Sequence, residues 1–329
     1  MNPDGIPSPP SQWRSFNIGE WLRDLGLDWF TLNLVINAYA AFILIGIGVA
    51  LWLTNRRLVA RGAEPWVVLD IALWAVPLGI LGGRLYHVAT HPADYFYEGA
   101  DLLRIFYVWE GGLAILGAVS LGAVGAYIGA RSAGLRFSAY ADALAPGLLL
   151  AQGIGRTGNY FNQELFGAPT DLPWGLQIDR PNSAIPVGLP DDTLFHPTFA
   201  YEMLWNLLGA LVLIWVGRKL SLQWGRLFAL YLVWYGIGRA FLETIRLDPA
   251  ELILGVRVNV WGALLAIVLG IALYVRQGRR HPGAEPGPYL PGREWKPESE
   301  VHSEDDYFSL DDVDVDMEKP AGRQESTTS

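Results

Sequence analysis

The sequence contains no cysteine among its 329 residues. This absence excludes disulfide bonds, thiolate metal sites and a cysteine nucleophile supplied by the chain itself. Charged residues are also scarce, at 17% of the chain, whereas an ordinary soluble domain carries about 25%. Apolar residues make up 51% of the sequence. These proportions favour a membrane protein over a pair of soluble domains.

The N-terminus lacks a basic region followed by a short apolar core, so we expect no cleavable signal peptide. The first apolar helix would then direct membrane insertion. Acidic residues are unevenly distributed, because residues 281–329 hold 13 acidic and 4 basic residues and the other 280 residues hold 20 of each. The net charge of −9 therefore belongs to the C-terminal tail, which is rich in Pro, Glu, Asp and Ser and is predicted to be disordered.

A series of apolar runs dominates the rest of the chain. A membrane-spanning helix needs about 20 predominantly apolar residues, and seven runs approach this length. They cover residues 32–54, 67–89, 109–130, 138–155, 198–217, 225–245 and 256–275. The predicted fold class is therefore an all-α polytopic membrane protein with seven transmembrane helices. Gly125 and Gly129 have the spacing typical of closely packed membrane helices.

Basic residues predict how this bundle is oriented. They form four clusters: Arg56, Arg57 and Arg61; Arg131 and Arg136; Arg218, Lys219 and Arg226; and Arg276, Arg279 and Arg280. The positive-inside rule makes their common side cytoplasmic, so the N-terminus is predicted outside and the C-terminus inside.

The predicted organisation has three parts. The first is an outer N-terminal segment over residues 1–30. The second is a membrane domain over 31–280, whose loop 156–197 forms a small periplasmic or extracellular head. The third is a disordered acidic cytoplasmic tail over 281–329, and deletion from residue 283 onward is predicted to leave activity intact.

Some arginines fall at the predicted outer ends of the helices, where the same rule disfavours them. They are Arg84, Arg156, Arg239 and Arg246. Ionisable residues inside a membrane are costly and are therefore candidates for function. For each arginine, a structural ion pair or snorkelling toward lipid headgroups is the alternative explanation.

The sixth apolar run ends in YGIGRAFLETIR at 235–246. On a continuous helix, Tyr235, Arg239, Glu243 and Arg246 would share one face. Two arginines that bracket a glutamate form a positively charged site, and a guanidinium matches phosphate oxygens in pairs. The spacing equally allows an Arg–Glu–Arg ladder that only holds helices together.

The fourth run ends in GRTGNYFNQELFG at 155–167. Its glycines permit tight turns and close backbone approach, and Asn159, Asn162 and Glu164 could hydrogen-bond a polar headgroup or one another. A well-capped re-entrant turn is the structural alternative. Two arginine-bearing segments at one membrane level nevertheless indicate an anionic lipid headgroup as the ligand.

Histidines near predicted helix ends are the remaining titratable candidates: His87, His91 and His196. Histidines in such positions are more often hydrogen-bonding surface residues than bases. No histidine–carboxylate spacing indicates a metal site, and neither a cofactor nor a nucleic acid is expected.

Six motifs together resemble those of the prolipoprotein diacylglyceryl transferase family. They are INAYAAF at 36–42, GGRLYHV at 82–88, WEGGLAI at 109–115, GRTGNYFNQELFG at 155–167, HPTFAYE at 196–202 and YGIGRAFLETIR at 235–246. They occur in the family's order, and the resemblance covers roughly residues 30–275. The first 28 residues and the acidic tail lie outside it.

The resemblance implies a bacterial inner-membrane enzyme with seven helices and a small periplasmic head. Such an enzyme transfers the diacylglyceryl group of phosphatidylglycerol to the thiol of a prolipoprotein lipobox cysteine, forming a thioether and releasing glycerol 1-phosphate. The implied partners are phosphatidylglycerol, the lipobox signal peptide and the bilayer, with the site toward the outer leaflet. A chain without cysteine fits this reaction because the nucleophile belongs to the substrate.

The matching motifs also predict site residues. The expected catalytic residues are Arg156, Arg239, Glu243 and Tyr235. The expected substrate-binding residues are Arg156, Asn159, Glu164, Gly167, Tyr39, Arg246, Arg84 and His196. In this interpretation the arginines balance the charge of the departing phosphate.

One position departs from the family. After WEGGLAI many members carry a histidine proposed to deprotonate the thiol, whereas this chain has Leu116. A neighbouring group (Glu243, Tyr235 or His196) or a thiol pKa lowered by the positive field of the site would have to replace it. Leu116 also favours an alternative in which the protein binds lipid or lipoprotein without catalysis. A transporter is a further alternative, which the lack of a clear internal repeat disfavours.

Overall fold

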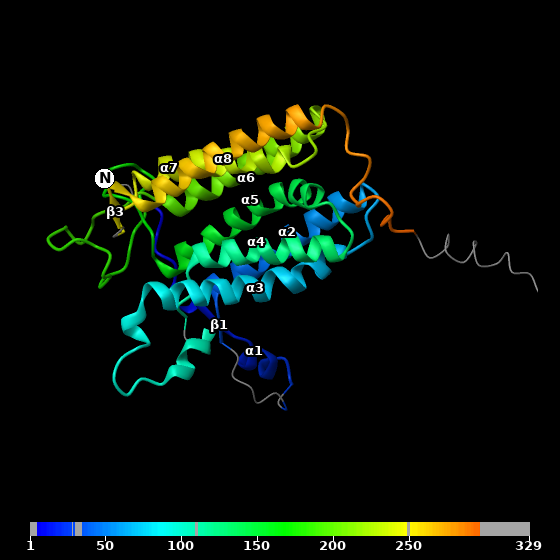
Figure 1. Ribbon diagram of the computed structural model, residues 1–329. Coiled ribbons are helices and arrows are strands. Elements are labelled where there is room, and N and C mark those ends of the chain that lie inside the picture. The colour runs from blue at the N-terminus through cyan, green and yellow to red at the C-terminus, as the bar shows by residue number, and fades with distance from the viewer. Residues whose placement is uncertain (1–4, 28, 30–34, 109–110, 249–250, 297–329) are drawn as a thin grey trace, which may run out of the picture. The chain divides into compact units, whose positions relative to one another are not determined.

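The structure, a computed structural model, describes residues 5–27, 29, 35–108, 111–248 and 251–296 (Figure 1). Within these ranges it is mainly helical, and seven of its helices have 18 or more residues. They are α2 (Ala38–Val59), α3 (Val67–Thr90), α4 (Ile115–Ser132), α5 (Phe137–Asn162), α6 (Thr198–Lys219), α7 (Arg226–Glu243) and α8 (Val258–Arg280). Each overlaps one of the seven apolar runs, so the predicted helical architecture is confirmed.

Five of these helices, α2, α3, α4, α6 and α8, are long and apolar enough to cross a membrane. The other two fall short because of their polar residues. Helix α7 carries Arg226, Arg239 and Glu243 within 18 residues, and α5 carries Asp142 and Arg156. The composition of the helices thus supports a helical membrane protein with five candidate spans.

Helix α5 is the central element of the bundle. It contacts α2, α4, α6 and α7, and Figure 1 shows it between the group α6–α8 and the group α2–α4. Its buried Asp142 accepts hydrogen bonds from the backbone N–H groups of Gly225 (2.8 Å) and Phe228 (2.9 Å). These groups lie at the start of α7, where a carboxylate is favoured by the exposed N–H groups and the helix dipole. Asp142 therefore joins the two long helices that are not among the five candidate spans.

Helices α3 and α4 pack closely because glycines face one another. A Cβ atom at Gly82 would lie 2.3 Å from the carbonyl oxygen of Gly117, so neither position accepts a side chain. A Cβ at Gly125 would lie 2.4 Å from the carbonyl oxygen of Trp74, and one at Gly129 would lie 2.8 Å from the Cα of Ile71. The predicted packing role of the pair Gly125 and Gly129 is thereby confirmed.

The mainly helical structure agrees with the predicted all-α class, and a few short strands add to the helices. Strand β1 (Ser15–Asn17) pairs antiparallel with β2 (Val35–Asn37), and β3 (Leu252–Ile253) pairs with β4 (Val256–Arg257). Between β1 and β2 lies the short helix α1 (Ile18–Asp24), whose first turn is capped by the side chain of Asn17. Short 3-10 helices cover Ser11–Trp13, Pro92–Asp94 and Leu102–Phe106.

The N-terminal segment contacts the loop between α5 and α6. The backbone of Ile6 is hydrogen-bonded to Gly175 and Gln177. The carboxylate of Asp179 accepts hydrogen bonds from Ser8 (2.6 Å) and Gln163 (2.8 Å) and is paired with Arg14. The hydrogen bonds from Ser8 and Gln163, together with Arg14, lower the pKa of Asp179.

Residues 281–293, which we call the C-terminal strap, follow α8 and contact the ends of other helices. The buried carboxylate of Glu285 contacts Arg61 and Ser138, while its backbone N–H donates to Gln223. Buried Tyr289 accepts a hydrogen bond from the backbone N–H of Glu64 at 3.0 Å. The strap thus connects the α2–α3, α4–α5 and α6–α7 loops.

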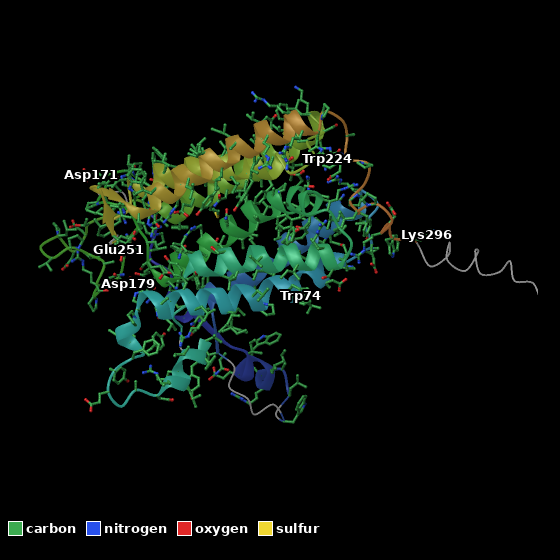
Figure 2. The ribbon with its side chains drawn as sticks, viewed as in Figure 1. Trp74, Asp171, Asp179, Trp224, Glu251 and Lys296 are labelled. Carbon is green, nitrogen blue, oxygen red and sulfur yellow. The ribbon has the colours of Figure 1, made fainter. Side chains whose placement is uncertain are left out.

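These strap contacts also show that the three loops meet at one end of the helices, together with the end of α8, where His281 stacks on Trp224. The four basic clusters lie at or beside these helix ends. We call the other end, where α2, α4, α6 and α8 begin, the site end. Asp179 and Glu251 lie at the site end and Trp224 lies at the opposite end (Figure 2).

Candidate active site

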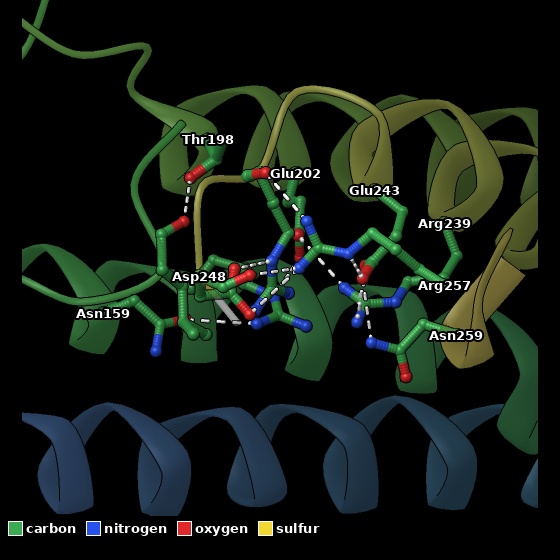
Figure 3. A network of polar contacts seen from close by, with 11 residues as sticks. Asn159, Thr198, Glu202, Arg239, Glu243, Asp248, Arg257 and Asn259 are labelled. Carbon is green, nitrogen blue, oxygen red and sulfur yellow. Dashed lines mark hydrogen bonds and ion pairs between the residues drawn. The ribbon is translucent and has the colours of Figure 1, made fainter. Parts of the chain in front are cut away.

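Arginines and carboxylates gather at the site end in one connected group, the arginine–carboxylate cluster. Its members are Arg156 from α5, Glu202 from α6, Arg239 and Glu243 from α7, Arg246 and Asp248 from the following loop, and Arg257 at the start of α8. Figure 3 shows how ion pairs and hydrogen bonds connect these side chains across four helices. The group holds four guanidinium groups and three carboxylates.

Glu202 connects the first two arginines. Its Oε2 pairs with Nε of Arg156, and its Oε1 lies 3.7 Å from Nη1 of Arg239. The residue is 7% exposed, and a buried carboxylate requires this kind of compensation because it has lost its hydration. Glu202 therefore draws Arg156 and Arg239, from different helices, toward one point.

Glu243 is fully buried and lies between Arg239 and Arg257. Its Oε2 lies 3.0 Å from Nη2 of Arg239, one helical turn away. Its Oε1 lies 2.8 Å from Nε of Arg257 and accepts a hydrogen bond from Nδ2 of Asn259 at 2.9 Å. The predicted contact between Arg239 and Glu243 is confirmed, but the carboxylate is shared with α8.

Arg246 does not extend the face formed by Arg239 and Glu243, because α7 ends at Glu243. The prediction of a continuous helix to residue 246 is therefore wrong. Arg246 instead pairs antiparallel with Gly167 and places its Nε 2.7 Å from Oδ1 of Asp248. Burial opposes its charged form, but Asp248 and the neighbouring carboxylates outweigh burial and raise the pKa of Arg246.

The GRTGNYFNQELFG motif lies mostly on α5, which continues to Asn162, so this described segment is helix and not a re-entrant turn. Arg156 donates from Nη1 to Oδ1 of Asn159 at 3.2 Å. Asn159 donates to Oε1 of Glu164 at 2.8 Å, and Asn162 donates to the same oxygen at 3.1 Å. The polar residues of the motif thus satisfy one another around Arg156.

Glycines allow close approaches beside the cluster. A Cβ at Gly158 would lie 2.7 Å from Cδ2 of Tyr39, so the missing side chain lets Tyr39 of α2 lie against α5. A Cβ at Gly167 would lie 2.7 Å from the Cβ of His196. Backbone hydrogen bonds join the chain at Gly167 to His196, with Nδ1 of His196 lying 3.2 Å from the Tyr201 hydroxyl.

Two other predicted site residues make no ion pair with the cluster among the described residues. Tyr235 lies one helical turn before Arg239. Its ring stacks on that of Tyr231, with 6.1 Å between the ring centroids. Arg84 is 4% exposed and donates to the backbone carbonyl groups of Arg104, Ile105, Gly111 and Gly112. These bonds make Arg84 an organiser of the loop between α3 and α4.

Two pockets accompany these residues. A polar pocket of about 360 Å³ is lined by Arg84, His87, Asp94, Tyr95, Arg104, Gly111 and Gly112. An apolar pocket of about 340 Å³ is lined by Trp13, Phe16, Ile36, Ala38, Ala41, Phe42 and Phe161. The apolar pocket borders the start of α2, next to Tyr39. Within the described ranges, no group of three His, Cys, Asp or Glu side chains could hold a metal ion.

Sequence reasoning missed some members of the network. They are Glu202, Asp248, Arg257 and Asn259. Two signals were present in the sequence: Glu202 ends the quoted motif HPTFAYE, and Arg257 is the second residue of the apolar run 256–275, at its predicted outer end. The rule that drew attention to the other outer arginines applies equally to Arg257.

Long apolar helices that converge on a buried ionic cluster define a multi-pass membrane protein with a polar site at one end. The sequence model of the prolipoprotein diacylglyceryl transferase family matches residues 28–276, and the chain belongs to this family. The family and the transferase class predicted from the six motifs are therefore confirmed.

Individual relatives agree with this assignment. The phosphatidylglycerol–prolipoprotein diacylglyceryl transferase of Leifsonia xyli subsp. xyli is 54% identical, over 98% of this chain and 96% of the relative. Transferase 2 of Streptomyces coelicolor is 50% identical over 76% of this chain and 78% of the relative. The Rhodococcus jostii enzyme is 47% identical over 81% and 79%, respectively. The Leifsonia match also extends beyond residues 30–275, which carried the resemblance.

Proposed function

We propose that this chain transfers the diacylglyceryl group of phosphatidylglycerol to the lipobox cysteine thiol of a prolipoprotein, the first step of lipoprotein maturation. The sulfur forms a bond to a glycerol carbon, the bond from that carbon to the phosphate oxygen breaks, and glycerol 1-phosphate leaves. The phosphate oxygen keeps the electron pair of the broken bond, and the thiol proton passes to water. The names of the relatives, which include phosphatidylglycerol and prolipoprotein, support this pair of substrates.

The observation that carries the proposed mechanism is the charge balance of the arginine–carboxylate cluster. Four arginines meet three carboxylates, and Nη1 of Arg239 is buried without a hydrogen-bond partner among the described residues. The N–H group at Nη1 can therefore donate a hydrogen bond to a phosphate oxygen. Preorganised donors in a dry site stabilise charge that develops on a leaving group. Arg239 and Arg156, which both contact Glu202, hold the phosphate as it departs.

The surrounding predicted residues position the substrate. Asn159 and Glu164 fix the guanidinium of Arg156, and Tyr39 of α2 lies against Gly158, two residues further along α5. The apolar pocket beside Tyr39 receives an acyl chain. Gly167 brings the segment of Arg246 close to the cluster.

Further predicted residues support the site from its edges. Tyr235 lies one turn before Arg239, and His196 pairs with the backbone at Gly167. Arg84 shapes the polar loop before α4.

Position 116 supplies no proton acceptor, because Leu116 occupies the first turn of α4. Glu243 has both oxygens near arginines, and Nδ1 of His196 faces the Tyr201 hydroxyl. A positive environment lowers the pKa of a thiol. The field of the four arginines therefore favours the thiolate of the bound peptide without a histidine at this position.

In the membrane, all seven long helices span the bilayer, with the N-terminus outside and the C-terminus in the cytoplasm. Helices α5 and α7 tolerate their polar residues because these pair with other helices rather than face lipid. The four basic clusters at the end opposite the arginine–carboxylate cluster support this orientation. The reaction then takes place toward the outer leaflet.

The test uses purified protein, phosphatidylglycerol and a lipobox peptide, with the diacylglyceryl thioether detected by mass spectrometry. Arg239→Ala is expected to lower the rate by about 10²–10³-fold, the range seen when one preorganised donor is removed. Arg180, which pairs with Asp191 in the head, provides a matched control as Arg180→Ala. A peptide with Ser in place of Cys should give no product.

A folded wild-type protein that binds phosphatidylglycerol but yields no thioether would contradict the transferase proposal. It would favour the binding-only alternative, for which Leu116 is the specific observation. Leu116→His is then the variant that tests whether a proton acceptor at that position restores turnover.

A further inference from the structure

Arg257 is an arginine of the cluster that no predicted motif contains. It ends β4 and precedes the first turn of α8. Its Nη1 donates to the carbonyl oxygen of Arg246 at 2.8 Å, and its Nη2 donates to that of Asp248 at 2.6 Å. Its Nε faces Glu243 at 2.8 Å. The guanidinium therefore joins the start of α8 to the end of α7 and the loop that follows.

The contacts of Glu243 divide between its two oxygens. Oε1 is occupied by Arg257 and by the amide of Asn259, whereas Oε2 faces Nη2 of Arg239 at 3.0 Å. A fully buried carboxylate with a single arginine neighbour would be expected to engage both edges of that guanidinium. Here Oε1 has the charge of Arg257 and the hydrogen bond of Asn259 beside it, so Arg239 faces only Oε2, which it approaches as an ion pair without a hydrogen bond.

The consequence appears on Arg239. Its Nη1 is buried, has no hydrogen-bond partner among the described residues, and lies 3.7 Å from Glu202. A buried donor without a partner is costly unless a ligand completes it. The arrangement thus keeps one guanidinium edge available while the net charge around it stays positive.

We infer that Arg257 is a positioning residue, which balances the charge of Glu243 and thereby keeps the Nη1 edge of Arg239 available for an anionic phosphate oxygen. This inference rests on the proposed function, in which Arg239 holds the phosphate. Arg257 acts through Glu243 and touches no substrate. When the charge of Arg257 is removed, Glu243 binds both edges of the Arg239 guanidinium. The phosphate then loses the Nη1 donor.

The experiment compares Arg257→Met, which removes the charge, with Arg257→Lys, which keeps the charge and loses the planar fork that reaches both backbone carbonyl groups. We expect Arg257→Met to raise KM for phosphatidylglycerol about tenfold, a change of about 1.4 kcal/mol. Arg257→Lys should stay within about threefold of wild type. Binding of short-chain phosphatidylglycerol is measured in parallel, so that lipid affinity is obtained even for variants without turnover.

The Glu243→Gln background separates the proposed role from direct lipid contact. There Arg257→Met should change phosphatidylglycerol affinity by less than about twofold, because no carboxylate remains to be balanced. This pair also serves if the single Arg257→Met variant does not fold. Arg180→Met is the matched surface control.

Three results would overturn the inference. They are equal losses in Arg257→Lys and Arg257→Met, unchanged affinity in folded Arg257→Met, and an undiminished effect in the Glu243→Gln background. Wild type and Arg180→Met report on the proposed function separately, because their failure to form thioether would contradict that function itself.

Discussion

Gly158 sets the distance between α2 and α5 beside the cluster. A Cβ atom there would lie 2.7 Å from Cδ2 and 2.9 Å from Cα of Tyr39. The second contact involves backbone, so a rotamer change cannot relieve it. Arg156 and Asn159 lie on the same stretch of α5, and a displacement of α2 would therefore change where Tyr39 lies relative to both.

Gly158→Ala should lower the transfer rate by about tenfold or more, because catalysis is sensitive to displacements of even about 1 Å. Gly48→Ala in the same helix as Tyr39 provides the matched control, since no described atom lies within 4 Å of a Cβ at Gly48. Rates are measured by thioether formation, with thermal unfolding to confirm that both variants fold. Equal rates for the two variants would show that the close approach at Gly158 is dispensable.

At this scale the sequence predicted the most important contacts only in part. Arg239 and Glu243 pair because helical spacing alone brings them together. Arg246 left the expected face because the chain after Glu243 pairs with the segment around Gly167, far away in sequence. Arg257 was missed for the same reason, since its contact with Glu243 depends on how α7 and α8 pack.

Whole helices were more predictable than single contacts wherever hydropathy determines the bounds of the helix. The second and fifth apolar runs were predicted over residues 67–89 and 198–217, and α3 and α6 cover Val67–Thr90 and Thr198–Lys219. The end of α5 was predicted too early, because ion pairs and amide hydrogen bonds accommodate its last polar residues. Periodicity carries no information about such tertiary partners.

The C-terminal strap was missed because its sequence is rich in Pro and Gly and its partners are three distant loops. Truncation after Pro282 should destabilise the protein by on the order of 3 kcal/mol, since it removes buried Tyr289, a loss comparable to deleting a large core aromatic. The ion pair of Glu285 with Arg61 is lost as well. Thermal unfolding in detergent measures the effect.

Truncation after Lys296 is the control, because it keeps the strap and removes only the residues beyond it. This variant should unfold at the wild-type temperature. If truncation after Pro282 were equally harmless, the strap contacts would contribute nothing to stability.

The molecule as a whole separates its charges between two ends. The basic clusters and the strap share the end opposite the arginine–carboxylate cluster, and the head with Asp179 lies at the site end (Figure 2). Composition could predict this separation, because basic residues recur after every second apolar run. It could not predict that α5 and α7 bring polar groups to each other inside the bundle.

The absence of cysteine makes the proposed orientation directly testable with single introduced cysteines. Val187 in the head is fully exposed, and Leu220 at the end of α6 is 57% exposed. With the N-terminus outside, Val187→Cys should react with a membrane-impermeant maleimide in intact spheroplasts, and Leu220→Cys should react only after the membrane is opened. The cysteine-free parent should remain unlabelled. The reverse labelling pattern would mean that the topology is inverted and that the arginine–carboxylate cluster lies toward the cytoplasm. Labelling of both sites in intact spheroplasts would mean that residues 187 and 220 face the same side.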